Sequence, residues 1–259
     1  MTAPDVLQPS SPEEAVSLFG AGVTVIGGGT IVVPELTSGR LRPRKAMLLT
    51  GAGLSGITRE GSRITIGAMT PVSELVSLPA PIGPCAANVA DVEIRAQGTV
   101  GGNLCAGEGV EAPRGDLQGA LLAVGATVRS AGAGRETTEP LEDFLPHRED
   151  RLVLDVSFEE PSAGAFAPLI RAHTHDYTTL AVSAARTADG AVRLAVSGVA
   201  GHAVRLSGAE AKASDVEAAA DAASADATFA DDALASAWYR ERTLPVLVRR
   251  ALTQLQEDS

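Results

Sequence analysis

The first seventy residues alternate short apolar runs with capping and turn residues. Ser11-Pro12-Glu13-Glu14 places a capping serine and a first-turn proline ahead of apolar residues, which predicts a short helix. The apolar runs at 23–26 and 45–49 predict two buried strands, the first of which ends at three glycines. Residues 56–67 alternate apolar and polar side chains about Glu60-Gly61, a pattern typical of a β-hairpin.

The rest of the chain mixes helical and extended patterns. Residues 70–79, 85–89 and 116–124 are predicted helices, and residues 126–130 and 151–158 are predicted strands. Pro161-Ser162-Ala163-Gly164 has turn chemistry and is predicted to link two units. Beyond it the pattern predicts a helix over 178–186, a strand over 191–199, an alanine-rich helix over 214–227 and a final helix whose apolar face holds Leu244, Leu247, Val248, Ala251, Leu252 and Leu255.

Composition narrows the class of protein. Hydrophobic residues make up 45% and charged residues 20% of the 259 positions, which is usual for a globular chain. The net charge of −11, without a lysine or arginine cluster, argues against nucleic acid or an anionic membrane as a partner. No apolar run approaches the roughly 20 residues that span a bilayer. The chain is therefore expected to be soluble.

The cysteine content indicates a reducing compartment and limits the redox chemistry. Only Cys85 and Cys105 are present, and no charged-then-apolar leader precedes them, so we expect a cytoplasmic protein without a disulfide framework. A cysteine-ligated iron–sulfur cluster normally takes four thiolates, which this chain lacks. His173-Thr174-His175-Asp176 could place two imidazoles on one face of a strand, but a partly exposed strand edge explains it better, and no metal site is expected.

The stretch Val23–Pro34, VTVIGGGTIVVP, invites comparison with a dinucleotide-binding fingerprint. In that fingerprint a third small residue lets the following helix pack on the strand. Here Val32 occupies that position and Pro34 follows closely, so the Rossmann interpretation fails. Taken alone, the loop could simply be a tight turn in which the glycines supply positive backbone angles.

A second glycine loop changes the interpretation of the first. Thr99-Val100-Gly101-Gly102 also follows apolar residues and also places paired glycines beside a threonine. Both loops lack side chains where backbone amides could face oxyanions, so the two could clasp a pyrophosphate from opposite sides. Neither contains the Gly-Lys-Ser or Gly-Lys-Thr of a nucleoside triphosphatase, which disfavours that activity.

Four features in order carry a more specific resemblance: Gly28-Gly29-Thr30 after a strand, a hairpin ending in Ile64–Ala68, Ile94-Arg95 before Gly98–Asn103, and Pro113–Leu117 before an apolar helix. Tyr239-Arg240 adds a match near the C-terminus. Together they resemble the FAD-binding medium subunits of the molybdenum hydroxylases, the xanthine dehydrogenase and carbon monoxide dehydrogenase family. Ile31, Ala96 and the longer 106–112 segment differ from the usual pattern of that family.

The resemblance implies an α+β fold with a two-lobed FAD-binding domain of the vanillyl-alcohol-oxidase type at 1–160, its lobes at about 1–55 and 56–160. A small C-terminal domain with a short antiparallel sheet and a helical bundle would occupy 161–259. It also implies that the cofactor lies against Asp116, Leu154 and both loops. Without the resemblance, Asp116 would be a helix cap and Leu154 a core residue. The expected FAD contacts are Ile26, Gly27, Gly28, Gly29, Thr30, Ile31, Val32, Thr99, Val100, Gly101, Gly102, Asn103, Asp116 and Leu154.

The implied function is electron transfer. In this family a large subunit carries the molybdenum cofactor, a small subunit carries two-iron iron–sulfur clusters, and electrons pass through FAD to NAD or another acceptor. The cofactor performs the redox step, so no catalytic side chain is expected. Two alternatives stay open: a stand-alone FAD oxidoreductase that uses the same loops, and a flavin-free assembly protein of the same fold.

Overall fold

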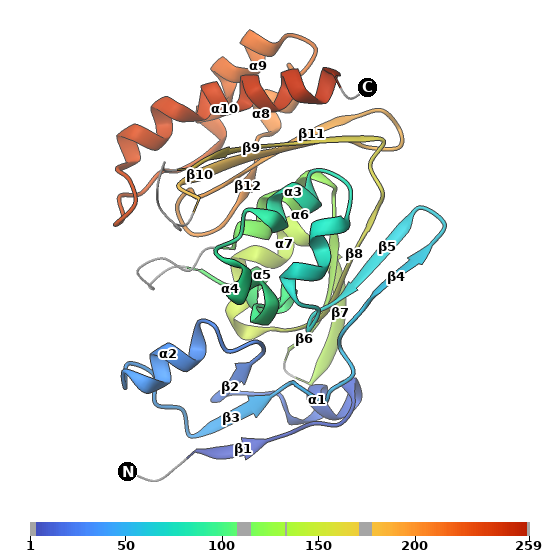
Figure 1. The fold of residues 1–259 in the computed structure, drawn as a ribbon, viewed down its shortest axis with the longest axis vertical. Helices are drawn as coiled ribbons and strands as arrows, with labels where there is room; N and C mark the ends of the chain where they lie inside the picture. The colour runs from blue at the N-terminus through green and yellow to red at the C-terminus, as the bar shows by residue number, and fades with distance from the viewer. Residues whose placement is uncertain (1–3, 108–114, 133, 171–177, 258–259) are drawn as a thin grey trace.

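The computed structural model of the chain stacks sheets and helices in layers (Figure 1). It describes residues 4–107, 115–132, 134–170 and 178–257, so His173-Thr174-His175-Asp176 lies outside the described residues. From the C-terminal end, the layers are a group of helices, a four-stranded sheet, a second group of helices, a five-stranded sheet and a small N-terminal sheet. Strands and helices thus follow the α+β pattern expected from the sequence.

The N-terminal lobe is a three-stranded parallel sheet in the order β1-β3-β2. Its elements are β1 (Asp5–Leu7), α1 (Pro12–Leu18), β2 (Val23–Ile26), α2 (Val32–Thr37) and β3 (Lys45–Leu48). The first helix begins as predicted, because the Ser11 hydroxyl oxygen accepts a hydrogen bond from the Glu14 amide at 3.2 Å. Helix α2 was not predicted, and it holds Pro34 in its first turn, where a missing N–H breaks no helical hydrogen bond.

A five-stranded antiparallel sheet in the order β4-β5-β8-β6-β7 forms the middle of the chain. Its strands are β4 (Ile57–Glu60), β5 (Arg63–Gly67), β6 (Thr127–Gly132), β7 (Arg135–Pro140) and β8 (Leu152–Glu159). The helices beside it are η1 (Val72–Ser77), α3 (Ile82–Ala87), α4 (Val92–Gln97), α5 (Val100–Cys105), α6 (Asp116–Ala123), α7 (Leu141–Phe144) and η2 (Leu145–Asp150). The predicted hairpin is therefore confirmed as β4 and β5.

The C-terminal unit packs helices on an antiparallel sheet in the order β12-β11-β10-β9. Its elements are β9 (Ala163–Leu169), β10 (Leu180–Arg186), β11 (Val192–Ser197), β12 (Val204–Arg205), α8 (Ser207–Glu210), α9 (Val216–Ala222), η3 (Ala223–Asp226) and α10 (Ala237–Glu257). The apolar face predicted for the last helix is confirmed, and its members are buried against the sheet: Leu244, Leu247, Val248, Ala251, Leu252 and Leu255.

The helix predicted over 178–186 is wrong, because residues Leu180–Arg186 form β10 in the centre of the sheet. The run is rich in alanine, which favours helix locally. In the fold it pairs with β9 on one side and β11 on the other, and both of its faces are buried. Pairing with these two neighbouring strands and burial in the sheet therefore override the local propensity.

Smaller differences concern the ends of elements and the second glycine loop. The predicted helix over 70–79 is the 3₁₀ helix η1, and the predicted helix at 85–89 lies earlier, at Ile82–Ala87. The expected linker is partly ordered, since β9 already begins at Ala163. The loop at 99–103 is mostly the first turn of α5, with Thr99 as its N-cap.

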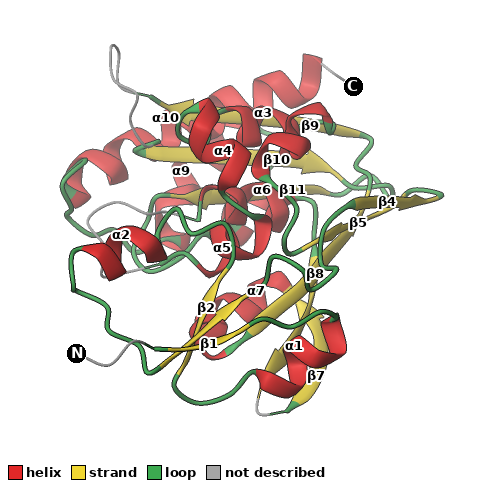
Figure 2. Cartoon of the chain, turned by 60° about the horizontal axis from the view of Figure 1, so that its bottom comes forward, coloured by secondary structure: helices red, strands yellow, loops and turns green. Residues whose placement is uncertain are grey.

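Helix α6 joins the two larger sheets and thereby fixes the layers. Gly119 lies so close to β11 that its amide donates to the Ser197 hydroxyl at 3.1 Å, and an added Cβ would lie 2.4 Å from that oxygen. The Gln118 side chain accepts a hydrogen bond from the Ala203 amide at 3.0 Å. The N-terminal lobe is attached through a separate core, in which Met47 and Leu49 pack with Leu154 of β8. Figure 2 shows the lobe beside that strand.

Candidate functional site

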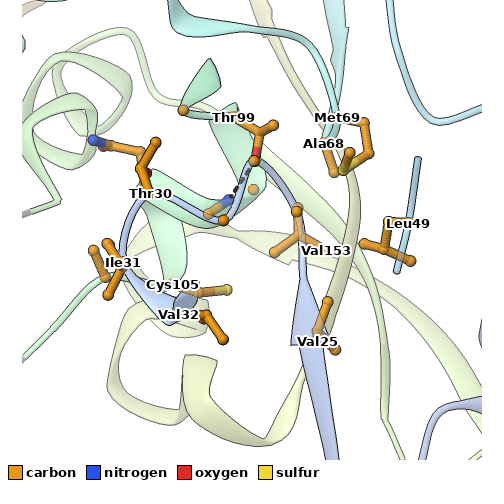
Figure 3. Close-up of a pocket in the computed structure, with 18 of the residues that line it drawn as sticks. Val25, Thr30, Ile31, Val32, Leu49, Ala68, Met69, Thr99, Cys105 and Val153 are labelled. Atoms are coloured by element: carbon orange, nitrogen blue, oxygen red, sulfur yellow. Dashed lines mark hydrogen bonds between the residues drawn. The ribbon is translucent and has the colours of Figure 1, made fainter. Parts of the chain in front are cut away.

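A cavity of about 520 Å³ lies between the N-terminal lobe and the helices of the middle unit (Figure 3). Apolar side chains from both parts form much of its wall, among them Val25, Leu49, Met69 and Val153. Backbone of the two glycine segments forms another part. Of the residues expected to contact a cofactor, those on the wall are Gly27, Gly28, Gly29, Thr30, Ile31, Val32, Thr99, Gly101, Gly102, Asn103 and Asp116.

The first glycine segment presents backbone amides to this cavity. It connects β2 to α2, and Gly29 adopts a φ of +77°, which glycine tolerates without strain. The Gly29 carbonyl accepts the Val33 amide at 2.9 Å, which closes the first turn of α2. Among the described residues, no backbone group accepts the amides from Gly28 to Val32. These N–H groups are therefore available to an oxyanion.

The second glycine segment differs, because its amides are already used inside the protein. The Val100 amide donates to the Thr70 carbonyl at 3.0 Å, and the Gly101 amide donates to the Ala68 carbonyl at 2.8 Å. The Thr99 hydroxyl caps the Gly102 amide at 3.2 Å. This segment therefore contributes a wall without side chains and a threonine hydroxyl, while the amides of Val100, Gly101 and Gly102 have acceptors inside the protein.

The two glycine segments pack directly on each other. An added Cβ on Gly28 would lie 1.7 Å from the Gln97 carbonyl oxygen, and one on Gly27 would lie 2.8 Å from the Thr99 hydroxyl oxygen. Gly101 is similarly close to Ala68, at 3.0 Å from an added Cβ to the alanine Cβ. The glycines thus allow the N-terminal lobe to approach the middle unit and to close one side of the cavity.

Asn103 and Asp116 are brought together by a helix cap. The Asn103 side-chain oxygen accepts a hydrogen bond from the Leu117 amide at 2.9 Å, which satisfies a donor in the first turn of α6. Asp116 is the first residue of that helix, and Gly115 holds the N-cap position that the sequence had offered to Asp116. Both residues therefore lie on the cavity wall at the start of one helix.

Three of the expected cofactor residues lie behind the wall. Ile26, Val100 and Leu154 are buried, and none of them lines the cavity within the described part of the chain. Leu154 packs in the core shared with the N-terminal lobe, whereas its neighbour Val153 lines the cavity. The part of β8 that lines the cavity, Leu152 and Val153, therefore ends one residue before Leu154.

Two residues on the cavity wall, Cys105 and Arg148, were not among the expected cofactor contacts. Both line the cavity, and the Cys105 thiol donates to the Arg148 carbonyl at 3.8 Å. Burial raises the pKa of Cys105 to about 12, although the Arg148 charge acts in the opposite direction. The thiol is therefore neutral at physiological pH. Arg148 lies in the short helix η2, and no motif in the surrounding sequence marks it as a cavity residue.

The family comparison decides the class of this cavity. A family described as the FAD binding domain in molybdopterin dehydrogenase matches residues 2–158. The chain belongs to this family. The resemblance noted from the glycine segments is thereby confirmed, and the chain is a FAD-binding subunit of the oxidoreductase class.

Relatives support the membership over nearly the whole length. The chain is 27% identical over 274 residues to the carbon monoxide dehydrogenase medium chain of Hydrogenophaga pseudoflava, covering 94% of each. It is 26% identical over 273 residues to the nicotine 6-hydroxylase medium subunit of Paenarthrobacter nicotinovorans, covering 95% of each. A solved structure of carbon monoxide dehydrogenase from Hydrogenophaga pseudoflava superposes with a TM-score of 0.85 at 26% identity, covering 99% of this chain and 98% of that one. The expected fold class is confirmed.

Within the described residues, no helix combines the length and apolar character needed to cross a bilayer. In the same residues, histidine, cysteine, aspartate and glutamate side chains do not gather in groups of three that could hold a metal ion.

Proposed function

We propose that this chain is the FAD-carrying electron-transfer subunit of a molybdenum-dependent hydroxylase. It would pass electrons from the two-iron iron–sulfur clusters of a small subunit to NAD or another acceptor, while a large subunit holds the molybdenum cofactor and the substrate. Family membership and the full-length match to medium subunits support this role. When bound, FAD supplies the capacity to accept and release electrons, and the protein supplies binding and orientation.

The observation that carries the proposal is the pair of unlike glycine segments in one cavity. The amides from Gly28 to Val32 would hold the pyrophosphate of FAD, because no described backbone carbonyl accepts them. Gly101 and Gly102 line the same cavity and carry no side chains, so they would leave room for the cofactor. The residues present therefore fit a flavin dinucleotide.

The remaining wall would orient the cofactor and keep water away from it. Val25, Leu49, Met69 and Val153 offer apolar surface suited to an aromatic ring system. Asp116 offers a carboxylate for the polar part of the cofactor. Electron transfer requires no side chain to move a proton, so we assign no catalytic residue.

The unit boundaries and the compartment belong to the same proposal. Residues 1–160 would form the FAD-binding domain, with lobes at about 1–55 and 56–160, and residues 161–259 would form the C-terminal domain. The cytoplasm is the expected location, because the only two cysteines, Cys85 and Cys105, are free thiols.

The test is the flavin content and reactivity of the purified chain. We expect a flavin absorbance spectrum, or tight FAD binding after titration into flavin-free protein, and co-purification with a molybdenum subunit and an iron–sulfur subunit. The flavin should be reduced by a hydroxylase substrate only in the assembled complex. A chain that binds no flavin would refute the proposal and favour an assembly protein. Reduction by small substrates without partners would refute it in favour of a stand-alone oxidoreductase.

A further inference from the structure

Arg148 is a buried cation on the cavity wall. It lies in η2, and only 5% of its surface is exposed. Its guanidinium donates to three backbone carbonyls: Nη1 to Leu145 at 2.7 Å, Nη2 to Gly201 at 3.1 Å, and Nε to Ala106 at 3.3 Å. These bonds join η2, the end of α5 and the C-terminal unit, and they hold the charge in one place.

This cation has no carboxylate partner in the part of the chain that the structure describes. The other buried arginine, Arg240, pairs with Asp232 at 2.7 Å. Arg151, which also lines the cavity, lies 3.4 Å from the Glu139 carboxylate. A buried charge is unfavourable unless an opposite charge compensates it, and carbonyl dipoles compensate only part of it. Three hydrogen bonds also leave two of the five guanidinium N–H donors unassigned.

The chain reserves space for this guanidinium. An added Cβ on Gly107 would lie 2.0 Å from Nη2 of Arg148, so any side chain there would displace the charged group. Gly107, Ala106 and Arg148 all line the cavity. Gly107 therefore leaves the guanidinium at the wall, because it has no side chain that would occupy the same space.

We propose that Arg148 supplies the positive charge that holds the phosphates of the flavin nucleotide. This inference rests on the proposed function of the cavity. The glycine segments contain no lysine or arginine, so their amides offer only neutral donors. Asp116 and Glu149 add carboxylates to the same wall, and the chain carries a net charge of −11. A fixed cation would offset these carboxylates and add to the amide contacts with an anionic cofactor, and the pyrophosphate is the only permanent charge of FAD.

The experiment compares a cofactor that has phosphates with one that has none. Flavin-free full-length protein is titrated with FAD and with riboflavin, at low and at physiological ionic strength, by flavin fluorescence. Arg148→Gln should weaken FAD binding by about 10-fold to 100-fold, which is typical of losing a charge-assisted hydrogen bond. Riboflavin binding should stay within about twofold of the wild type, and the salt dependence of FAD binding should decrease.

Two further variants separate charge from structure. Arg148→Lys keeps the charge and should retain most of the preference for FAD over riboflavin. Arg63→Gln removes a half-exposed charge from the β4–β5 hairpin and should change neither titration. If Arg148→Gln does not fold, Arg148→Met, which keeps the volume of the side chain, takes its place.

The outcomes distinguish this inference from the function on which it rests. Equal weakening of FAD and riboflavin would overturn the inference, because a structural role predicts that result. An unchanged FAD affinity in Arg148→Gln would overturn it as well, while leaving the proposed function intact. A wild-type chain that binds neither ligand would instead refute the proposed function.

Discussion

Gly28 and Gln97 touch backbone to backbone across the boundary between the N-terminal lobe and the middle unit. A Cβ added to Gly28 would lie 1.7 Å from the Gln97 carbonyl oxygen and 3.2 Å from the Cα of Gly98. No rotamer change can relieve such an overlap, because both partners are main chain. The glycine is therefore required for the two walls of the cavity to meet, in addition to any contact with a cofactor.

Gly28→Ala is expected to separate the glycine segments and to weaken FAD binding by at least tenfold. Overpacking of this kind typically costs about 1–3 kcal/mol, and here the backbone itself must move. Flavin fluorescence titration gives the affinity, and thermal unfolding gives the stability. Gly20→Ala is the control, since nothing lies within 4 Å of an added Cβ there. Wild-type affinity in Gly28→Ala would show that the contact does not shape the cavity.

Asn103 is expected to have two separable roles. Asn103→Ala removes the acceptor for the Leu117 amide and should lower the free energy of unfolding by about 1 kcal/mol. Asn103→Asp keeps the acceptor and should preserve stability. It also adds a negative charge near Asp116, so FAD affinity should fall about tenfold. Chemical denaturation and flavin titration measure the two effects. If both variants lost stability and FAD affinity to the same extent, the two roles of Asn103 would not be separable.

The thiol of Cys105 should make stability depend on alkaline pH. Its pKa is about 12 in the folded protein, against 9.0 for the unperturbed group. Below pH 9 the thiol stays protonated in both states, so it adds no pH dependence. Between about pH 9 and 12 the unfolded chain releases a proton that the folded chain keeps, which favours unfolding by about 1.4 kcal/mol per pH unit.

Cys105→Ala should remove this contribution and flatten the decline of unfolding free energy above pH 9. Burial also raises the pKa of Cys85, so part of the alkaline decline should remain in the variant. Urea denaturation of both proteins across this pH range measures the difference. Identical pH profiles would mean that the Cys105 thiol ionises as easily in the folded protein as in the unfolded chain.

Glu210 and Glu142 both contact Arg205 but should contribute unequally to stability. Glu210 accepts two hydrogen bonds from Arg205, at 2.5 and 3.2 Å, and one from the Leu194 amide at 2.9 Å. These bonds raise the pKa of Arg205 and tie α8 to β11 and β12. Glu210→Ala should lower the free energy of unfolding by about 1–3 kcal/mol.

Glu142→Ala should lower it by less than about 1 kcal/mol, because the side chain is 48% exposed and its single contact with Arg205 is screened by solvent. Thermal or urea unfolding of the two variants gives the comparison. A larger loss for Glu142→Ala would show that the ion pair between the middle and C-terminal units matters more than the bonds within the C-terminal unit.

Local sequence determined the elements whose causes are themselves local. The opening helix follows from the Ser11 cap and Pro12, and the hairpin follows from alternation around Gly61. The final helix follows from its apolar face, and the glycine segments revealed the family because two unusual motifs occurred in a fixed order. The helix and hairpin signals each lie within the element itself, whereas the family signal needs the order of two separate motifs.

Tertiary structure decided the features that depend on contacts between elements. Residues 180–186 became a strand because β9 and β11 pair with its two edges, while α10 and α6 pack against it. Val153, in place of Leu154, lines the cavity because the cavity reaches only the first two residues of β8, Leu152 and Val153. The amides of Val100 and Gly101 donate hydrogen bonds to carbonyls about thirty residues earlier in the chain, and no local sequence pattern reveals these bonds.

The residues of the cavity show the same division between what the sequence determined and what the tertiary structure decided. The sequence alone identified the glycines that form its wall, because their conformational freedom and lack of side chains are intrinsic to the residue type. It gave no sign of Arg148, whose importance arises from carbonyls of Leu145, Ala106 and Gly201 that meet only in the folded chain. Burial and the absence of a described counter-charge are properties of the surroundings, so only the tertiary structure could give that arginine its place.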